Sequence, residues 1–129
     1  MNVEGYHAHI YFPSADPAAG AAYQQRMRER FGELVAVGRF HAQAVGPHPI
    51  AMFQVAFPAG HLEELVQWLT GQREGRSILI HPITGNDLAD HRDHALWLGP
   101  QLALTLAFLE KLTQPATYAI PKSPKPSAG

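Results

Sequence analysis

The clearest hydrophobic pattern is the alternation at residues 6–12, which has the period of a half-buried strand. The even-numbered side chains of this segment are apolar or aromatic, so they would form one face of the strand. The opposite face would carry His7, His9 and Tyr11. One face of this strand could therefore pack in a core, and the other could carry catalytic or metal-binding groups.

The chain up to residue 112 divides into helical and extended segments separated by Gly and Pro. Asp16 and Pro17 form a helix start, and apolar residues then recur every fourth position until Gly32. The full pattern predicts helices at about 17–31, 62–71 and 101–112, and extended segments at 34–40, 50–57, 77–81 and 95–98.

The order of the first six predicted elements, strand–helix–strand–strand–helix–strand, is typical of the ferredoxin-like plait. We therefore expect one α+β domain at residues 1–112, with a four-stranded antiparallel sheet and both helices on one face. In the plait's strand order, 4-1-3-2, the first strand is central and the last strand runs antiparallel beside it. The extended segment and the helix that follow would cover an edge or contact a partner. The Pro-rich residues 113–129 are expected to form an extended or disordered tail, dispensable for chemistry.

Histidine is the unusual feature of the composition, since eight occur among 129 residues. Cysteine is absent, which excludes disulfides, thiolate nucleophiles, Cys-ligated zinc and iron–sulfur clusters. The formal net charge is −1 and the basic residues are dispersed, so we expect no nucleic-acid partner. Because no leader pattern and no membrane-length apolar run occur, we expect a cytoplasmic protein without membrane contact.

The first and last strands of the plait would bring three histidines together. His7 and His9 would lie about 7 Å apart on the face that no helix covers, because alternate strand residues share a face. His81 would join them from the neighbouring strand if the pleat of that strand directs its side chain to the same face. Three such imidazoles could form a facial site for iron, zinc, copper or nickel. The competing interpretation is that each is only a half-exposed sheet residue, which explains a single histidine better than the cluster.

Two loops carry further candidate residues. His48 lies between two prolines that fix its backbone, so it could be a catalytic group near Tyr11, at the pocket rim or across a subunit boundary. The segment Asp90–His94 could supply a metal ligand, a proton shuttle and an anchor for a substrate carboxylate, or it could be a solvated loop. Trp97 could be a core or interface residue, or could stack on a substrate.

Four separated motifs occur in order along the chain: YHAHIYF at 6–12, GPHP at 46–49, IHP with TG at 80–85, and DHRDHALWLG at 90–99. Together they resemble the DOPA 4,5-dioxygenase family over about residues 5–110. The resemblance implies a small cytoplasmic enzyme with a ferredoxin-like fold, usually dimeric, that uses non-haem Fe(II). Such an enzyme opens a catechol ring beside its hydroxyls with O₂ and gives a muconate semialdehyde.

We therefore expect a metal-dependent extradiol dioxygenase that acts on a DOPA-like or caffeate-like catechol, as a homodimer. Fe(II) would occupy the site, although zinc or another divalent metal could replace it. The residues expected to act are the metal ligands His7, His9 and His81; the catalytic residues His48, an acid or base, His94 and Tyr11; and the substrate-binding residues Arg92 and Trp97. Because the common non-haem set is two histidines and a carboxylate, Asp90, Asp93 or a third histidine must complete it.

Two other functions are consistent with the sequence. The plait could be a dimeric module that binds a small aromatic ligand or a metal through its histidines without turnover. It could also hold zinc for metal-assisted hydrolysis, although no motif indicates this.

Overall fold

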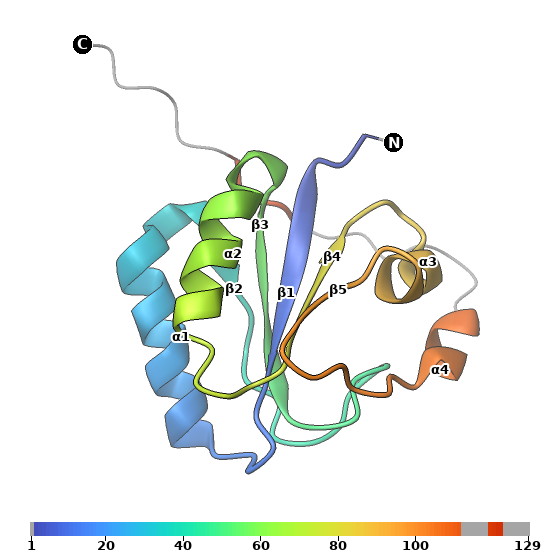
Figure 1. Ribbon diagram of the computed structural model, residues 1–129, viewed down its shortest axis with the longest axis horizontal. Coiled ribbons are helices and arrows are strands. Elements are labelled where there is room, and N and C mark those ends of the chain that lie inside the picture. The colour runs from blue at the N-terminus through green and yellow to red at the C-terminus, as the bar shows by residue number, and fades with distance from the viewer. Residues whose placement is uncertain (1, 112–118, 123–129) are drawn as a thin grey trace.

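The described part of the chain, residues 2–111 and 119–122 of a computed structural model, has an α+β fold. Residues 32–34 and 59–61 form single 3-10 turns. The helices and strands (Figure 1) are, in chain order, β1 (Gly5–Tyr11), α1 (Pro17–Phe31), β2 (Ala36–Val37), β3 (Met52–Pro58), α2 (Leu62–Gly71), β4 (Ile78–Pro82), α3 (Asp87–Arg92), β5 (Leu96–Leu98) and α4 (Leu106–Glu110).

The strands form one sheet in the order β2-β3-β1-β4-β5, and every neighbouring pair is antiparallel. As expected, β1 is central and β4 runs beside it. The prediction of four strands was wrong, because Leu96–Leu98 pairs with Ile78–Ile80 as a fifth strand. This pairing covers the outer edge of β4, whose backbone N–H and C=O groups would otherwise lack strand partners.

Helices α1 and α2 begin and end where the sequence predicts. Asp16 caps α1 by accepting a hydrogen bond from the Ala18 N–H at 3.0 Å, and Pro17 takes the first helical position. In α2, Leu65 and Leu69 are fully buried, as the i, i+4 spacing of its apolar stripe requires.

Three other predictions need correction. The strand expected at 34–40 is reduced to β2, since a 3-10 turn ends at Leu34. The helix expected at about 101–112 is found only as α4; residues 101–105 are not helical, and Leu112 lies outside the described residues. Helix α3 was not predicted as a helix.

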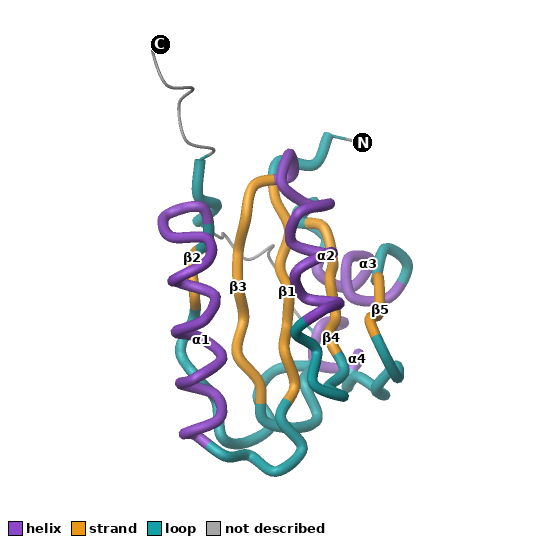
Figure 2. The backbone as a smooth tube through the Cα atoms, turned by 60° about the vertical axis from the view of Figure 1, so that its left-hand side comes forward, coloured by secondary structure: helices purple, strands orange, loops and turns teal. Residues whose placement is uncertain are grey.

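The sheet separates two layers of different character (Figures 1 and 2). Helices α1 and α2 pack on one side, which we call the helix face, whereas α3 and α4 lie on the other. We call that other side the histidine face; Tyr11, Met52 and Leu79 form a buried apolar cluster there, and Trp97 packs against it. The core of the helix face includes Ala8, Ile10, Phe53, Val55, Phe57, Ile78 and Ile80 from the strands, with Tyr23, Met27, Phe31, Leu65 and Leu69 from the helices.

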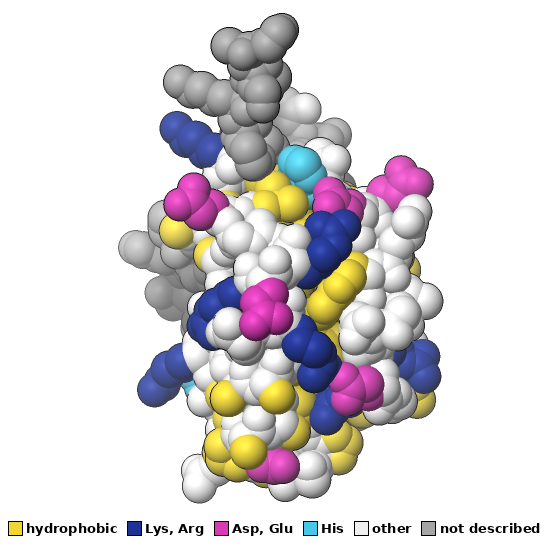
Figure 3. Space-filling view, turned by 90° about the vertical axis from the view of Figure 1, so that its left-hand side faces the viewer, with side chains coloured by type: hydrophobic (Ala, Val, Ile, Leu, Met, Phe, Trp, Pro, Cys, Tyr) yellow, Lys and Arg dark blue, Asp and Glu magenta, His cyan; other side chains and the backbone are white. Residues whose placement is uncertain are grey.

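The outer surface around α1 carries acidic and basic side chains intermixed (Figure 3). Such mixing is typical of a solvated surface and creates no strong field of one sign. No helix in the described ranges is long and apolar enough to cross a membrane.

Of the tail expected at 113–129, the structure describes only residues 119–122, which form no helix or strand. Ile120 lies against Gly5, where a Cβ atom would come within 2.6 Å of the Ile120 side chain. The remaining tail residues lie outside the described part, so the dispensability of the tail stays a prediction.

Candidate metal centre

Five buried histidines meet on the histidine face within the described residues. Two come from β1 and one each from β4, α3 and the loop before β3. None is more than 6% exposed. The five are His7, His9, His48, His81 and His91.

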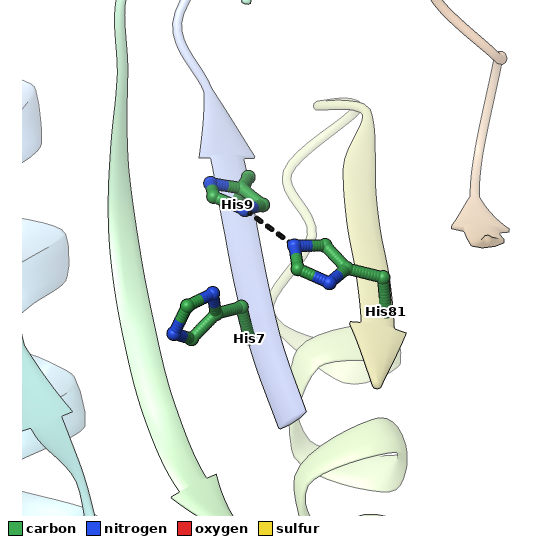
Figure 4. A group of neighbouring side chains, drawn as sticks. All are labelled: His7, His9 and His81. Atoms are coloured by element: carbon green, nitrogen blue, oxygen red, sulfur yellow. Dashed lines mark hydrogen bonds between the residues drawn. The ribbon is translucent and has the colours of Figure 1, made fainter. Parts of the chain in front are cut away.

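The three histidines expected to share a site are brought together (Figure 4). Candidate ligand atoms of His7, His9 and His81 all lie within 4.8 Å of one another. The sheet register explains this, because His7 pairs directly with His81, and His9 lies one step along on the same face. Nε2 of His9 lies 3.0 Å from Nε2 of His81.

Backbone carbonyls fix the ring orientation of two histidines. Nδ1 of His81 donates to the Pro82 carbonyl at 2.8 Å, and Nδ1 of His91 donates to the Asp87 carbonyl at 2.7 Å. A carbonyl only accepts, so Nδ1 carries the proton in both rings and the lone pair is on Nε2. Histidines that bind metals in proteins are commonly oriented by this kind of hydrogen bond.

The ring of His9 provides a test of whether a metal fits this site. Because the lone pair of His81 is on Nε2, the neutral His9 ring donates from its own Nε2, which leaves its lone pair on Nδ1. That Nδ1 atom is buried and has no hydrogen-bond partner among the described residues. A neutral His9 ring has one lone pair, which a cation could accept in place of a hydrogen-bond donor. The donor set therefore fits a metal ion of the kind that binds imidazole.

His48 belongs to a second group, because candidate ligand atoms of His9, His48 and His91 also lie within 4.8 Å of one another. Nδ1 of His48 is hydrogen-bonded to the Tyr11 hydroxyl at 2.7 Å, so the expected proximity to Tyr11 is found. His48 is 6% exposed, and its position at a pocket rim or a subunit boundary stays a prediction. Reciprocal backbone hydrogen bonds with Val45 close its loop.

The segment at 90–94 divides between the interior and the surface. Asp90 is 1% exposed and accepts hydrogen bonds from both the backbone N–H and the hydroxyl of Thr84. Asp93 is exposed and forms an ion pair with Arg92. Neither carboxylate belongs to a group with clustered ligand atoms among the described residues. The exposed His94 is likewise not in the cluster, and the structure places His91 there instead.

His91 is the site residue that we did not select from the sequence. Asn86 caps α3 by accepting a hydrogen bond from the Ala89 N–H at 3.1 Å, and this helix directs His91 inward. An Asn that precedes acidic residues is a known helix-start signal. Applied to residues 86–92, it would have predicted the helix that carries His91, and His94 lies beyond the end of this helix.

The two expected substrate-binding residues border one cavity beside the cluster. Arg92, Trp97 and His91 line this cavity, which measures about 230 Å³ and which we call the Arg92 cavity. Leu102, Leu104 and Leu106 add apolar walls. Trp97 is half-buried and stacks on Tyr11, with ring centroids 6.0 Å apart.

Burial keeps the clustered imidazoles neutral. Together with a smaller effect of nearby His91, it lowers the pKa of His7 to about 4 and that of His48 to about 3. Burial also holds the pKa of His9 and of His81 well below the ordinary value, and raises that of Tyr11. Neutral imidazoles carry the lone pairs that metal binding requires.

The chain matches a known protein family over most of its length. The model of the Dopa 4,5-dioxygenase family matches residues 6–108. The chain belongs to the Dopa 4,5-dioxygenase family. Membership in the Dopa 4,5-dioxygenase family supports a dioxygenase function.

Two curated proteins and one crystal structure are similar to this member of the Dopa 4,5-dioxygenase family. A DOPA 4,5-dioxygenase from Amanita muscaria is 32% identical over 115 residues, which are 83% of this chain and 50% of that protein. An uncharacterised 21.2 kDa protein from Botryotinia fuckeliana is 39% identical over 98 residues, 70% of this chain and 53% of that one. The chain therefore spans about half the length of these curated relatives. The crystal structure of a proposed dioxygenase from Nostoc punctiforme PCC 73102 has a TM-score of 0.73 and 42% identity, covering 86% of this chain and 95% of that one.

The lowered pKa values predict acid-sensitive stability of the metal-free protein. In the unfolded chain a histidine titrates near pH 6.5, whereas folded His7 and His48 titrate near 4 and 3. The unfolded state therefore binds more protons below pH 6.5, and each such histidine lowers the free energy of unfolding by about 1.4 kcal/mol per pH unit as pH falls from 6.5 to 4. Urea unfolding between pH 7.5 and 4.5 measures this. His48→Gln should flatten the slope and exposed His94→Gln should not; equal slopes in all three proteins would contradict the prediction.

Metal binding should depend on His9 more than on any other histidine, because His9 belongs to both groups of clustered ligand atoms. We expect His9→Ala to lose nearly all metal after anaerobic loading with Fe(II) and desalting, as elemental analysis would measure. His7→Ala removes a ligand from the first group only, and His48→Ala from the second only, so the more damaging variant identifies the group that binds. His94→Ala is the matched control, and full metal content in His9→Ala would rule out both groups.

Proposed function

We propose that this chain is a non-haem, metal-dependent extradiol dioxygenase that cleaves the ring of a DOPA-like or caffeate-like catechol. The observation that carries the proposal is the set of buried, neutral imidazoles His7, His9 and His81, whose candidate ligand atoms lie within 4.8 Å of one another. Membership in the Dopa 4,5-dioxygenase family supports the reaction class.

In the proposed reaction, one ring C–C bond beside the two hydroxyls breaks and both atoms of O₂ enter the product. A muconate semialdehyde has the composition of the catechol plus O₂, so no other co-reactant is consumed. Held by His7, His9 and His81, Fe(II) would supply redox chemistry and open coordination positions for catechol and O₂.

His48 is the proposed acid or base. When its Nδ1–H is donated to the Tyr11 oxygen, at 2.7 Å, the Nε2 atom carries the lone pair and can accept a phenolic proton. The low pKa of His48 keeps the ring neutral before substrate binds. Burial raises the pKa of Tyr11, so its hydroxyl remains protonated and orients His48.

The Arg92 cavity is the proposed binding site for the catechol. The Arg92 guanidinium would bind the side-chain carboxylate of the substrate, which offers two oxygens to a planar pair of N–H donors. Trp97 and the neighbouring leucines would pack on the aromatic ring. In the free protein, Asp93 accepts hydrogen bonds from Nε and Nη2 of Arg92, so a substrate carboxylate must compete with Asp93.

A catechol panel tests the proposed function directly. After anaerobic loading with Fe(II), we expect O₂ uptake and a yellow ring-opened product in equal amounts when a catechol is added in air. Aromatic binding without O₂ uptake would instead favour a non-catalytic binding module. Zinc-dependent, O₂-independent turnover of a hydrolysable substrate would indicate hydrolysis.

Substrate choice should depend on the carboxylate contact of Arg92. We expect Arg92→Gln to raise KM for DOPA or caffeate about 10- to 100-fold and to leave KM for 4-methylcatechol nearly unchanged, because the latter has no carboxylate. Asp93→Asn should have the opposite effect on carboxylated substrates, since it removes the competing group. Arg28→Gln on exposed α1 is the matched control. An equal rise in KM for all three catechols would exclude the carboxylate contact.

A further inference from the structure

Small side chains occupy the histidine face on the β2–β3 side of the cluster. In the sheet register, Ala36 pairs with Ala56, and Ala56 pairs with His7. Gly38 lies nearby and donates its backbone N–H to the Gln54 carbonyl at 2.7 Å. Alanine and glycine are poor strand formers, so their occurrence beside His7 is not explained by strand propensity.

These residues border a second pocket of about 230 Å³ that reaches His7 and is open to solvent at exposed Ala36; we call it the Ala36 cavity. Ala119 lines it as well. Apart from His7, the only polar side chain among its described lining residues is Gln54, and none of them is charged. The Arg92 cavity instead reaches His91 and carries a guanidinium. The two cavities therefore reach the cluster at different histidines and differ in chemistry.

The two co-substrates of the proposed reaction, the catechol and O₂, also differ in charge and polarity. A DOPA-like catechol carries a carboxylate, for which the described lining of this cavity offers no charged partner. Dioxygen is small, uncharged and apolar, and protein cavities with apolar walls accommodate small apolar species such as xenon. The cavity next to His7 has the walls that suit dioxygen, and the cavity next to His91 has those that suit the catechol.

Building on the proposed function, we propose that the Ala36 cavity is the binding site and entry route for O₂, separate from the catechol site. The catechol reaches the cluster from the α3 side and O₂ from the β2–β3 side. Bound catechol then leaves the path of O₂ open, and ring cleavage consumes one molecule of each. Larger side chains at Ala36 or Ala56 would close this route without touching the Arg92 cavity.

Xenon binding tests the cavity without any turnover. In crystals pressurised with xenon, we expect a xenon atom in contact with Ala36 and Ala56 in the unsubstituted protein and none there in Ala36→Leu. Ala36 is exposed on an edge strand, so the protein should tolerate this substitution. Ala56→Val provides a second closure of the same cavity if Ala36→Leu fails to fold. Ala103→Leu, at an exposed position lining the Arg92 cavity, is the matched control and should keep the xenon.

Steady-state kinetics of the Fe(II)-loaded protein tests the role. We expect Ala36→Leu to raise KM for O₂ about fivefold with KM for the catechol unchanged, and Ala103→Leu to show the reverse. An unsubstituted protein without xenon in this cavity, or an Ala36→Leu variant that raises only the catechol KM, overturns the O₂ route. If no catechol causes O₂ uptake, both the proposed dioxygenase function and the proposed role of the Ala36 cavity in O₂ binding are overturned. Turnover with an unchanged KM for O₂ in Ala36→Leu overturns the entry route alone.

Discussion

The removal of imidazoles from water is the constraint on which this structure depends. A buried histidine is kept neutral, and a neutral ring has one N–H to donate and one lone pair to satisfy. The chain meets the donor requirement locally, through the Pro82 and Asp87 carbonyls. The rings so anchored direct their lone pairs into the cluster, where side chains of other histidines take the place of solvent. Burial, which penalises protonation, thus prepares these rings as ligands and bases.

The two-residue period of β1 puts core side chains on one face of the strand and the histidines on the other. Ala8 and Ile10 face the core under α1 and α2, while His7 and His9 face the opposite layer. A register shift of one residue would put the histidines among aliphatic side chains, so the pattern that builds the core also orients the site. The central position of β1 adds neighbours on both sides, which allows His81 of β4 to lie directly opposite His7.

The sequence predicts best where a local pattern decides the structure. The alternation in β1 and the capped start of α1 are local. To bring His81 beside His7 and His9, the prediction also needed the strand order of the plait and one choice of pleat for the last strand. Strand β5 could not be assigned to the sheet because three residues pair only when the edge of β4 is already present. The segment at 101–105 was misread for a related reason: Leu102 and Leu104 pack as alternate residues of an extended chain, whereas helical spacing connected Leu102 to Leu106. His91 and the burial of His48 depend on a six-residue helix and a loop, whose positions tertiary contacts determine.

The membership of His9 in two ligand groups limits how many ions one chain can hold. A neutral imidazole offers a single lone pair, so one ion at either group removes His9 from the other. Occupation of the first group leaves His48 and His91 uncoordinated, and occupation of the second leaves His7 and His81. Binding through either three-histidine group would therefore allow one ion per chain and leave two of the five rings uncoordinated.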